Sequence, residues 1–147
     1  MKNFDPKEHV GLLVKFINGR VVNKINKNLS KFNLTRVQHE ILCFIDKNEH
    51  EGDVFQKDIE KCLKLTNPTV TGIVKRLEEK EMIVRCPSNN DARYKCLHVT
   101  EKGKDVICKS FKFGANNIEK QLVKGMTDEE IKILKDLLSR ALKNMEE

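Results

Sequence analysis

The side chains with the clearest chemical purpose lie in a charged segment in the second half of the chain. Arg93 follows Asp91 by two residues, within a run of turn-forming residues that begins at Pro87. Alternating apolar residues then continue to Val99, as in one strand of a β-hairpin. An arginine at a hairpin tip suits a narrow groove of high negative potential, such as the minor groove of duplex DNA, and Asp91 is expected to steady it. The alternative is a surface turn whose charge pair contributes little.

A second polar group lies upstream, at helical spacing. Val70, Val74 and Leu77, together with Ile73, recur at intervals of three and four residues, which predicts the buried face of a helix. The opposite face then carries small and polar residues at its N-terminal end and basic residues one turn later. A helix that enters the major groove needs this pattern, because its backbone must approach the base edges closely. An ordinary amphipathic helix with a solvated polar face is the alternative.

These two groups and the start of the preceding helix form the predicted DNA-binding set. We expect DNA contacts from Gln56, Lys57, Asn67, Pro68, Thr69, Thr71, Gly72, Lys75, Arg76, Asn89, Asn90, Asp91, Arg93 and Lys95. The charge distribution favours a polyanionic partner for this part of the chain. The formal net charge is +6, and residues 55–104, with 11 basic and 7 acidic side chains, carry +4 of it. A lysine-rich solvated surface would give the same totals.

Other kinds of chemistry find little support in the sequence. The glycines are too dispersed for a phosphate-binding loop, and no serine lies in a nucleophile-elbow pattern. The histidines are scattered, and the adjacent His39 and Glu40 are most simply part of a polar helix surface. We therefore expect no enzymatic activity, no cofactor and no bound metal.

The cysteines are odd in number and widely spaced, without a C-x-x-C pattern: Cys43, Cys62, Cys86, Cys96 and Cys108. In a reducing compartment they are most simply free thiols that pack as small apolar residues, with Cys43 buried and Cys86 opposite Cys96 on the hairpin. A cysteine-switched regulator remains the alternative. No apolar run reaches the ~20 residues of a membrane helix, and the N-terminus has no signal-peptide core, so we expect a cytoplasmic protein without a membrane partner.

The elements that must position these residues follow from periodicity and capping signals. A long apolar stripe predicts a first helix over about 6–29, and capping boxes at Thr35 and Thr127 mark the starts of the second and the sixth. Between them the sequence predicts helices over 55–63, from 67 and over 100–124, and strands over 82–86 and 94–99. The fold class is mainly α with a small β-hairpin wing. It is a winged helix-turn-helix with long N- and C-terminal helices for dimerisation.

In this order and spacing, the motifs resemble the MarR family of transcriptional regulators. The wing signature is Asp91-Ala92-Arg93 through Val99-Thr100-Glu101-Lys102-Gly103, and the recognition-helix pattern runs from Asn67 to Glu78. The resemblance covers nearly the whole chain and implies a single MarR-type domain over 1–147. Residues 30–104 would form the winged helix-turn-helix DNA-binding part, and 5–29 and 105–147 the dimerisation helices.

The resemblance also implies a mode of action. A homodimer would bind a pseudo-palindromic operator, with each recognition helix in a major groove and each wing over a minor groove. A small ligand or oxidation would relieve autorepression or control of nearby genes. Two positions depart from the family pattern. Glu81 stands where the family has glycine, and a left-handed backbone there would cost a non-glycine residue roughly 1 kcal/mol. Cys86 stands where the family often has a second arginine.

The sequence gives the least information about the signal that the protein senses. The default is a small-molecule effector in a pocket between the dimer base and the winged helix, with Phe16, Phe32, Phe44 and Phe111 as apolar walls and Phe113 as a further candidate. These rings are equally suited to an ordinary core. We predict a sequence-specific DNA-binding repressor released by such a ligand. The alternatives are a redox-sensing regulator of the same fold and a winged-helix protein-interaction module.

Overall fold

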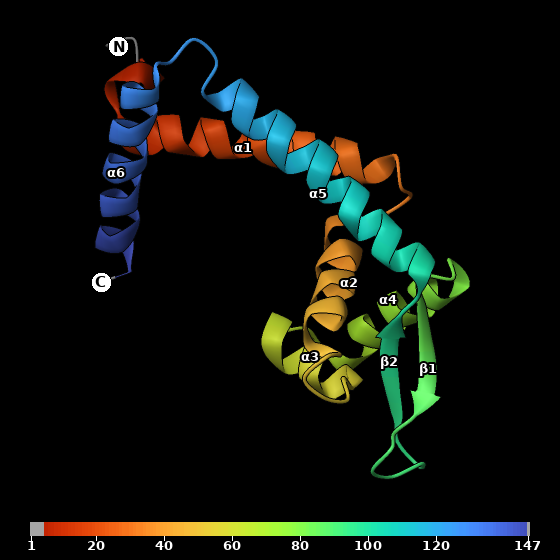
Figure 1. Cartoon of the computed structure of the whole chain (residues 1–147). Helices are drawn as coiled ribbons and strands as arrows, with labels where there is room; N and C mark the ends of the chain where they lie inside the picture. Colours follow the sequence, from red (N-terminus) through yellow and green to blue (C-terminus); the bar gives the residue numbers. More distant parts are fainter. Residues whose placement is uncertain (1–4, 147) are drawn as a thin grey trace.

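A computed structural model describes residues 5–146, apart from the side chains of Pro6, Phe113 and Ala115, so the prediction for Phe113 lies outside the described part. The elements are a 3-10 turn Pro6–Glu8, α1 (Val10–Ser30), α2 (Arg36–Asn48), α3 (Gln56–Leu63), α4 (Asn67–Glu79), β1 (Ile83–Pro87), β2 (Lys95–Val99), α5 (Glu101–Leu122) and α6 (Asp128–Met145). This mainly helical fold with a two-stranded antiparallel wing and long terminal helices confirms the predicted class (Figure 1).

Most predicted boundaries hold to within a few residues, and the clearest correction is at the start of α1. The first helix begins at Val10 rather than near Pro6, because His9 adopts an extended backbone (φ −124°, ψ 114°) and separates the 3-10 turn from the helix. Both predicted capping boxes are present. The hydroxyls of Thr35 and Thr127 accept from the amides of Gln38 and Glu130, each at 3.2 Å.

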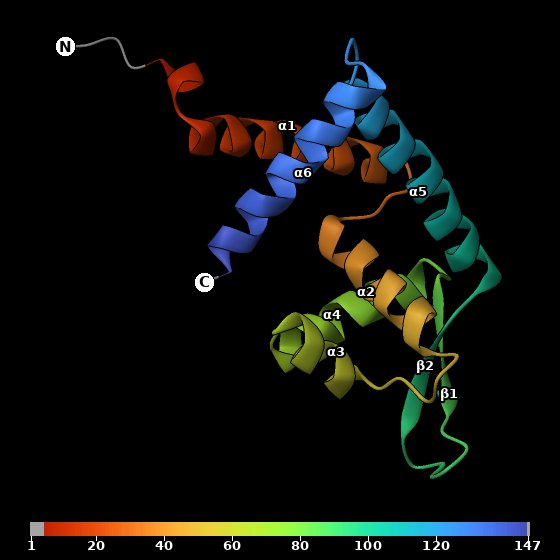
Figure 2. The ribbon, with the colours of Figure 1, turned by 60° about the vertical axis from the view of Figure 1, so that its left-hand side comes forward.

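The helices form two parts that α2 and α5 join. In the upper part α1 and α5 lie side by side, and α6 crosses near their far end (Figures 1 and 2). In the lower part α2, α3, α4 and the hairpin form the winged helix, with the wing projecting below it. Among residues 5–146, no helix combines the length and hydropathy that a bilayer crossing demands.

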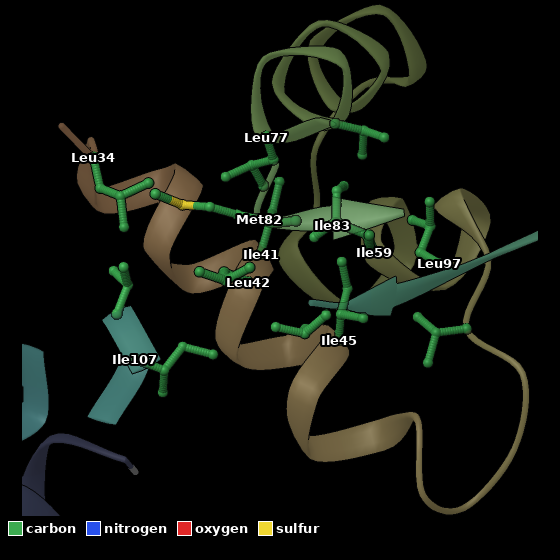
Figure 3. Packing of buried hydrophobic residues seen from close by; sticks show 14 of the residues in the cluster. Leu34, Ile41, Leu42, Ile45, Ile59, Leu77, Met82, Ile83, Leu97 and Ile107 are labelled. Atoms are coloured by element: carbon green, nitrogen blue, oxygen red, sulfur yellow. The ribbon is translucent and has the colours of Figure 1, made fainter. Parts of the chain in front are cut away.

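The hydrophobic core lies almost entirely in the lower part. Ile41, Leu42 and Ile45 of α2 are fully buried, and they meet the buried face of α4 and both wing strands (Figure 3). The predicted face of α4 is confirmed: Val70, Val74 and Leu77 are fully buried and Ile73 is partly buried. Since α4 is fixed along this face, its opposite face is fixed toward solvent.

The turn from α4 into the wing contains the unusual Glu81. Its φ of +58° is left-handed, as considered above for a position where the family has glycine. The Glu81 amide donates to the carbonyl of Glu78 and the Met82 amide to that of Leu77, at 2.8 and 3.0 Å. This pair of hydrogen bonds around a left-handed residue is a common helix ending. Met82 and Leu77, both buried, complete it with an apolar contact, so the geometry of a glycine ending is kept without glycine.

The start of α5 packs tightly against this turn. Thr100 caps α5 by accepting from the Gly103 amide at 3.1 Å, and its hydroxyl donates to the Glu81 carbonyl at 2.6 Å. A Cβ added to Gly103 would lie 2.4 Å from the carbonyl oxygen of Met82. The Thr-x-x-Gly pattern is therefore a requirement of close packing between α5 and the wing.

A lysine ties the end of α4 to the turn between α1 and α2. The ammonium of Lys80 donates to the carbonyl of Asn33, a left-handed residue, and to Oε1 of the buried Gln38 at 3.0 Å. Gln38 is also part of the capping box that starts α2. The last turn of α4 is thus anchored to the hinge that leads from the upper part into the lower one.

Candidate DNA-binding surface

The exposed face of α4 carries the residues that the sequence assigned to it. Thr69, Thr71, Gly72, Lys75 and Arg76 are all exposed. The N-cap is Thr66, whose hydroxyl lies 2.8 Å from that of Thr69. Pro68 lies in the first turn, where a missing amide hydrogen costs nothing. The helix therefore presents small and polar groups at its N-terminal end and two cations behind them.

A hollow of about 590 Å³ lies between α3, the start of α4 and the wing. It brings together five predicted residues from separate parts of the chain: Gln56, Lys57, Asn67, Arg93 and Lys95. Of the acidic side chains only Asp58 takes part in its lining, and its carboxylate accepts from the Phe55 amide at 2.8 Å as the cap of α3. The hollow is therefore concave and predominantly cationic, which suits a phosphate backbone.

Four residues of this hollow were missing from the predicted set: Phe55, Asp58, Arg85 and Tyr94. The ring of Tyr94 meets that of Phe55 edge-on, with centroids 6.4 Å apart. Arg85 precedes Cys86 on β1, and its guanidinium reaches across to α3 and α4. Arg85 could have been predicted, because it is a basic residue in the strand that follows α4. The prediction from the sequence concerned the neighbouring Cys86 instead.

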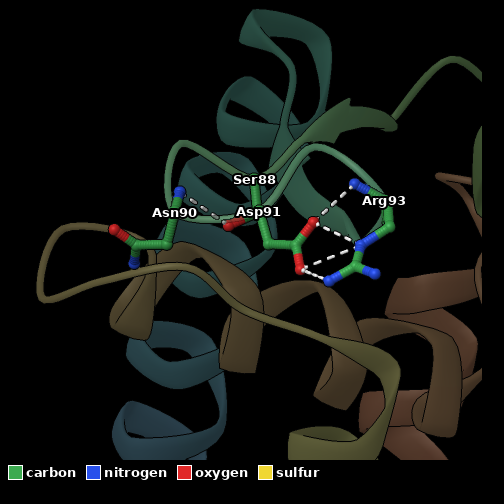
Figure 4. Close-up of polar contacts among 4 residues, drawn as sticks. All are labelled: Ser88, Asn90, Asp91 and Arg93. Carbon is green, nitrogen blue, oxygen red and sulfur yellow. Dashed lines mark hydrogen bonds and ion pairs between the residues drawn. The ribbon is translucent and has the colours of Figure 1, made fainter.

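The wing tip holds its arginine as expected. The Arg93 guanidinium donates to both carboxylate oxygens of Asp91, with Nη2 to Oδ2 at 2.7 Å and Nε to Oδ1 at 3.0 Å (Figure 4). The hydrogen bonds from Arg93 lower the pKa of Asp91. The Arg93 side chain is 85% exposed, so the pair orients the guanidinium without withdrawing it from solvent.

The base of the tip is anchored to the body of the protein. The buried hydroxyl of Ser88 donates to Asp53, in the loop before α3. It also accepts from the Asn90 amide at 3.2 Å (Figure 4). Asn89 and Asn90 are exposed beside it. The tip is therefore a fixed feature of the surface.

His39 corrects one sequence interpretation. It does not lie on an open polar surface but is half-buried between α2 and α5, with Nε2 2.8 Å from the hydroxyl of Ser110 and its ring 5.7 Å from that of Phe111. Burial lowers the pKa of His39. The contact was invisible in the sequence because it depends on how α5 crosses α2.

The thiols divide by environment. Cys62 and Cys108 are exposed, Cys43 and Cys86 are half-buried, and Cys96 is buried directly opposite Cys86 in the hairpin register. Burial, with smaller contributions from Asp46 and Glu40, raises the pKa of Cys43 to about 11. A thiol that is this hard to ionise is a poor nucleophile near neutral pH.

Within residues 5–146, one group of side chains has the spacing of a metal site: Asp46, Glu49 and His50, with ligand atoms within 4.8 Å of one another. Glu49, however, already accepts from the Val99 amide at 3.0 Å and pairs with Lys104 at 3.5 Å. These bonds engage both oxygens of Glu49 and place an ammonium beside the group.

The four phenylalanines proposed for an effector pocket lie in different surroundings. Phe16 on α1 and Phe111 on α5 are about half exposed, whereas Phe32 and Phe44 pack against the core. Phe44 also lines a small hollow of about 310 Å³ beside the loop before α3. Among the described side chains, Phe111 is the one of these four rings that contacts another ring, and that ring belongs to His39. The four rings therefore do not form one pocket within a single chain.

Comparisons with known proteins place this surface in context. A sequence profile described as the MarR family matches residues 32–93. The HTH-type transcriptional regulator YybA of Bacillus subtilis is 31% identical over 121 residues, covering 82% of this chain and 78% of the relative. MhqR of the same organism, also an HTH-type transcriptional regulator, is 27% identical over 116 residues, covering 79% and 77%.

Solved structures of transcription regulators are also similar to this chain. MepR, a transcription regulator of the Staphylococcus aureus multidrug efflux pump MepA, is 26% identical and covers 93% of this chain and 98% of its own, with a TM-score of 0.84. A mutant of MepR bound to an oligodeoxyribonucleotide matches with the same identity and coverage and a TM-score of 0.75.

Proposed function

Since this chain belongs to the MarR family of winged helix-turn-helix transcriptional regulators, we propose that it is a repressor that binds a pseudo-palindromic operator as a homodimer and leaves it when a small ligand binds. As a member of this family, it is a DNA-binding transcriptional regulator and not an enzyme. The observation that carries the proposal is the cationic hollow, where Lys57 of α3 and three cations of the wing, Arg85, Arg93 and Lys95, line one concave surface beside the start of α4. The site of action is then the cytoplasm, where the DNA lies.

The surface divides into two kinds of contact. Thr69, Thr71 and Gly72 let the start of α4 approach base edges in the major groove, with Lys75 and Arg76 near the flanking phosphates. Arg93, presented at the wing tip by Asp91, enters the minor groove. Residues 30–104 form this DNA-binding unit in our proposal, and 5–29 and 105–147 serve association.

A second copy of the chain is the partner that fits the terminal helices. Large apolar side chains are exposed along them, among them Val14, Ile17, Leu122, Leu138 and Leu142. Between α1, α5 and α6 runs an apolar groove of about 470 Å³, and α6 has no buried residue of its own. An exposed apolar surface of this extent marks an interface. Two-fold symmetry would also present two recognition helices to the two half-sites of one operator.

The effector is proposed to bind where the terminal helices meet the winged helix, close to Phe111 and His39. The phenylalanines that are separate in one chain can share a pocket only if the partner chain completes it. Oxidation is the weaker signal, because Cys43 resists ionisation and Cys96 is buried.

Selection of genomic fragments by the purified protein, followed by footprinting, tests the proposal. We expect protection of two half-sites related by two-fold symmetry, about 10 bp or a multiple apart. Affinity should fall steeply between low and physiological salt as phosphate contacts release counterions. A reporter behind the selected operator should be silenced by the protein and restored by a small molecule that raises the melting temperature of the dimer. Failure to enrich any DNA, or a flat salt response, would instead indicate a protein partner.

A further inference from the structure

A polar network spans α3, α4 and β1 beside the hollow. The Nη1 group of Arg85 donates to Oε1 of Gln56 at 2.9 Å, and its Nε donates to Glu78 at 2.8 Å. The amide Nε2 of Gln56 then donates to the hydroxyl oxygen of Thr71 at 3.1 Å. One arginine on the wing strand is thereby linked to the first residue of α3 and to two turns of α4.

The direction of each bond in this network is fixed by chemistry. A guanidinium has only donors, so the oxygen of the Gln56 amide must face Arg85. The amide nitrogen must then face Thr71, whose oxygen accepts the bond. Among residues 5–146 no acceptor within bonding distance is recorded for the Thr71 hydroxyl hydrogen, including the carbonyl one turn earlier in α4. Thr71 is exposed, so its hydroxyl can donate to a partner outside the chain.

We propose that Arg85 and Gln56 set the polarity of Thr71, so that it reads an acceptor on a base edge in the major groove. This inference rests on the proposed DNA-binding function. Guanine presents N7 and O6, adenine N7 and thymine O4, whereas cytosine presents only its amino donor there. The Thr71 hydroxyl therefore selects against cytosine at one position of each half-site. Arg85 acts as a positioning residue, because it reaches the base only through Gln56.

A single substitution reverses the polarity. In Gln56→Glu the carboxylate still accepts from Arg85, but it has no hydrogen to give, so the bond to Thr71 must run from the hydroxyl to the carboxylate. Thr71 then offers only lone pairs to the DNA. These suit the amino groups of cytosine or adenine, and the base preference at that position should change by about 3- to 10-fold, the effect of one hydrogen bond.

Selection from a random DNA pool by four proteins tests this. The wild type should disfavour cytosine at one position of each half-site, Gln56→Glu should shift that position toward cytosine or adenine, and Thr71→Val should lose the preference there. Lys57→Gln is the matched control, because it changes the charge by the same amount at the adjacent residue. It should lower affinity for every sequence and leave the preferences as they are.

The outcomes separate the two levels of the proposal. If Gln56→Glu and Thr71→Val bind DNA with the wild-type preference at every position, the reading by Thr71 is wrong while the function stands. If Lys57→Gln shifts the same position as Gln56→Glu, the change is a charge effect and the network has no special role. If the wild type selects no sequence at all, the proposed function itself fails.

Discussion

The winged helix and the terminal helices of this chain differ in how they expose their apolar side chains. In the winged helix, Ile41, Ile45 and Leu77 are sealed from solvent, and every element contributes to one cluster. Along α1 and α6, residues of the same type stay exposed, and α6 buries none of its side chains. The two regions have similar apolar content and opposite exposure.

The difference teaches that the chain contains one region whose apolar side chains are covered within the chain and one whose apolar side chains stay open. Polar bonds reinforce the closed region, as in the ties of Ser88 to the loop before α3 and of Lys80 to the hinge. The terminal helices enclose an open apolar groove, at which Lys135 of α6 pairs with Glu119 of α5 at 3.8 Å while the apolar side chains stay exposed. In the function that we propose, the closed region reads DNA and the open region serves association.

The largest expected effect comes from placing a charge on the open region. Leu138→Asp should leave the protein monomeric, since Leu138 lines the apolar groove and a buried carboxylate without a partner is costly. Operator affinity should fall by about 10²- to 10⁴-fold, because the two reading units are no longer linked. Sedimentation and gel-shift titration measure the two effects. Ser139→Asp, at the adjacent exposed position, should remain dimeric; a monomer there would mean that any charge on α6 disrupts it.

Truncations of core and surface residues sharpen the same contrast. In the monomeric Leu138→Asp background, Ile45→Ala should lower the free energy of unfolding by about 2–5 kcal/mol, because it leaves a cavity in a closed core. Leu142→Ala should change it by less than about 0.5 kcal/mol, since Leu142 is 65% exposed. Urea unfolding followed by circular dichroism gives both values. Equal losses would contradict the division into two regions.

The thiols test burial within the winged helix, because Cys43 on α2 is half-buried and Cys62 on α3 is exposed. The pKa of Cys43 is raised from 9.0 to about 11, so at pH 8 its thiolate fraction should be roughly 100-fold below that of an ordinary thiol. Alkylation at pH 8, mapped by mass spectrometry, should label the exposed Cys62 and Cys108 first, and Cys43 should gain reactivity only as the pH rises toward 11. The buried neutral thiol favours folding below pH 9, and this contribution is lost between pH 9 and 11. If Cys43 is labelled as early as the exposed thiols, the alternative of a cysteine-switched regulator is supported.

Removal of the wing arginine tests the reading unit without touching the rest. Arg93→Ala should weaken operator binding by about 10-fold and reduce the salt dependence by about one counterion, as expected for one groove-bound arginine. The dimer and its melting temperature should stay unchanged, because Arg93 contacts only the wing tip in the described structure. Asp91→Asn keeps the guanidinium and should cost less. If Arg93→Ala binds the operator with unaltered affinity, Arg93 does not contact the DNA.

The smallest effect concerns the turn between α4 and β1. Glu81→Gly should raise the free energy of unfolding by about 1 kcal/mol, because glycine adopts a positive φ without the steric cost that a side chain brings. Glu79→Gly, at the last residue of α4, should lower it by up to a similar amount through the poor helix propensity of glycine. Parallel urea titrations of the two variants give the comparison. A loss in both would show that the Glu81 side chain contributes more than its backbone costs.

Local signals in the sequence were sufficient to predict most of the helices and strands. The capping boxes at Thr35 and Thr127, the repeat of Val70, Val74 and Leu77, and the turn residues before Arg93 each specify an element through neighbours in the chain. The family pattern then supplied their arrangement. Even the strain at Glu81 was visible, because a glycine was missing where a left-handed residue was needed.

The remaining features depend on contacts between distant elements. Arg85 meets Gln56 and Glu78 only because β1 returns alongside α3 and α4. His39 meets Ser110 only because α5 crosses α2. The direction of the bond into Thr71 follows from a chain of donors and acceptors over three elements, and no periodicity in one element encodes it. Such side-chain contacts are the part of the site that required a structure.

The contact of Lys80 with Asn33 and Gln38 also has a mechanical meaning. It joins the end of α4 to the turn that follows α1 and to the first turn of α2. If the angle between α1 and α2 changes, this linkage must either stretch or carry the end of α4 along. In a two-fold symmetric dimer the two copies of α4 would move in opposite directions. A small rotation of α1 would then change the distance between the two α4 helices by twice the displacement of one.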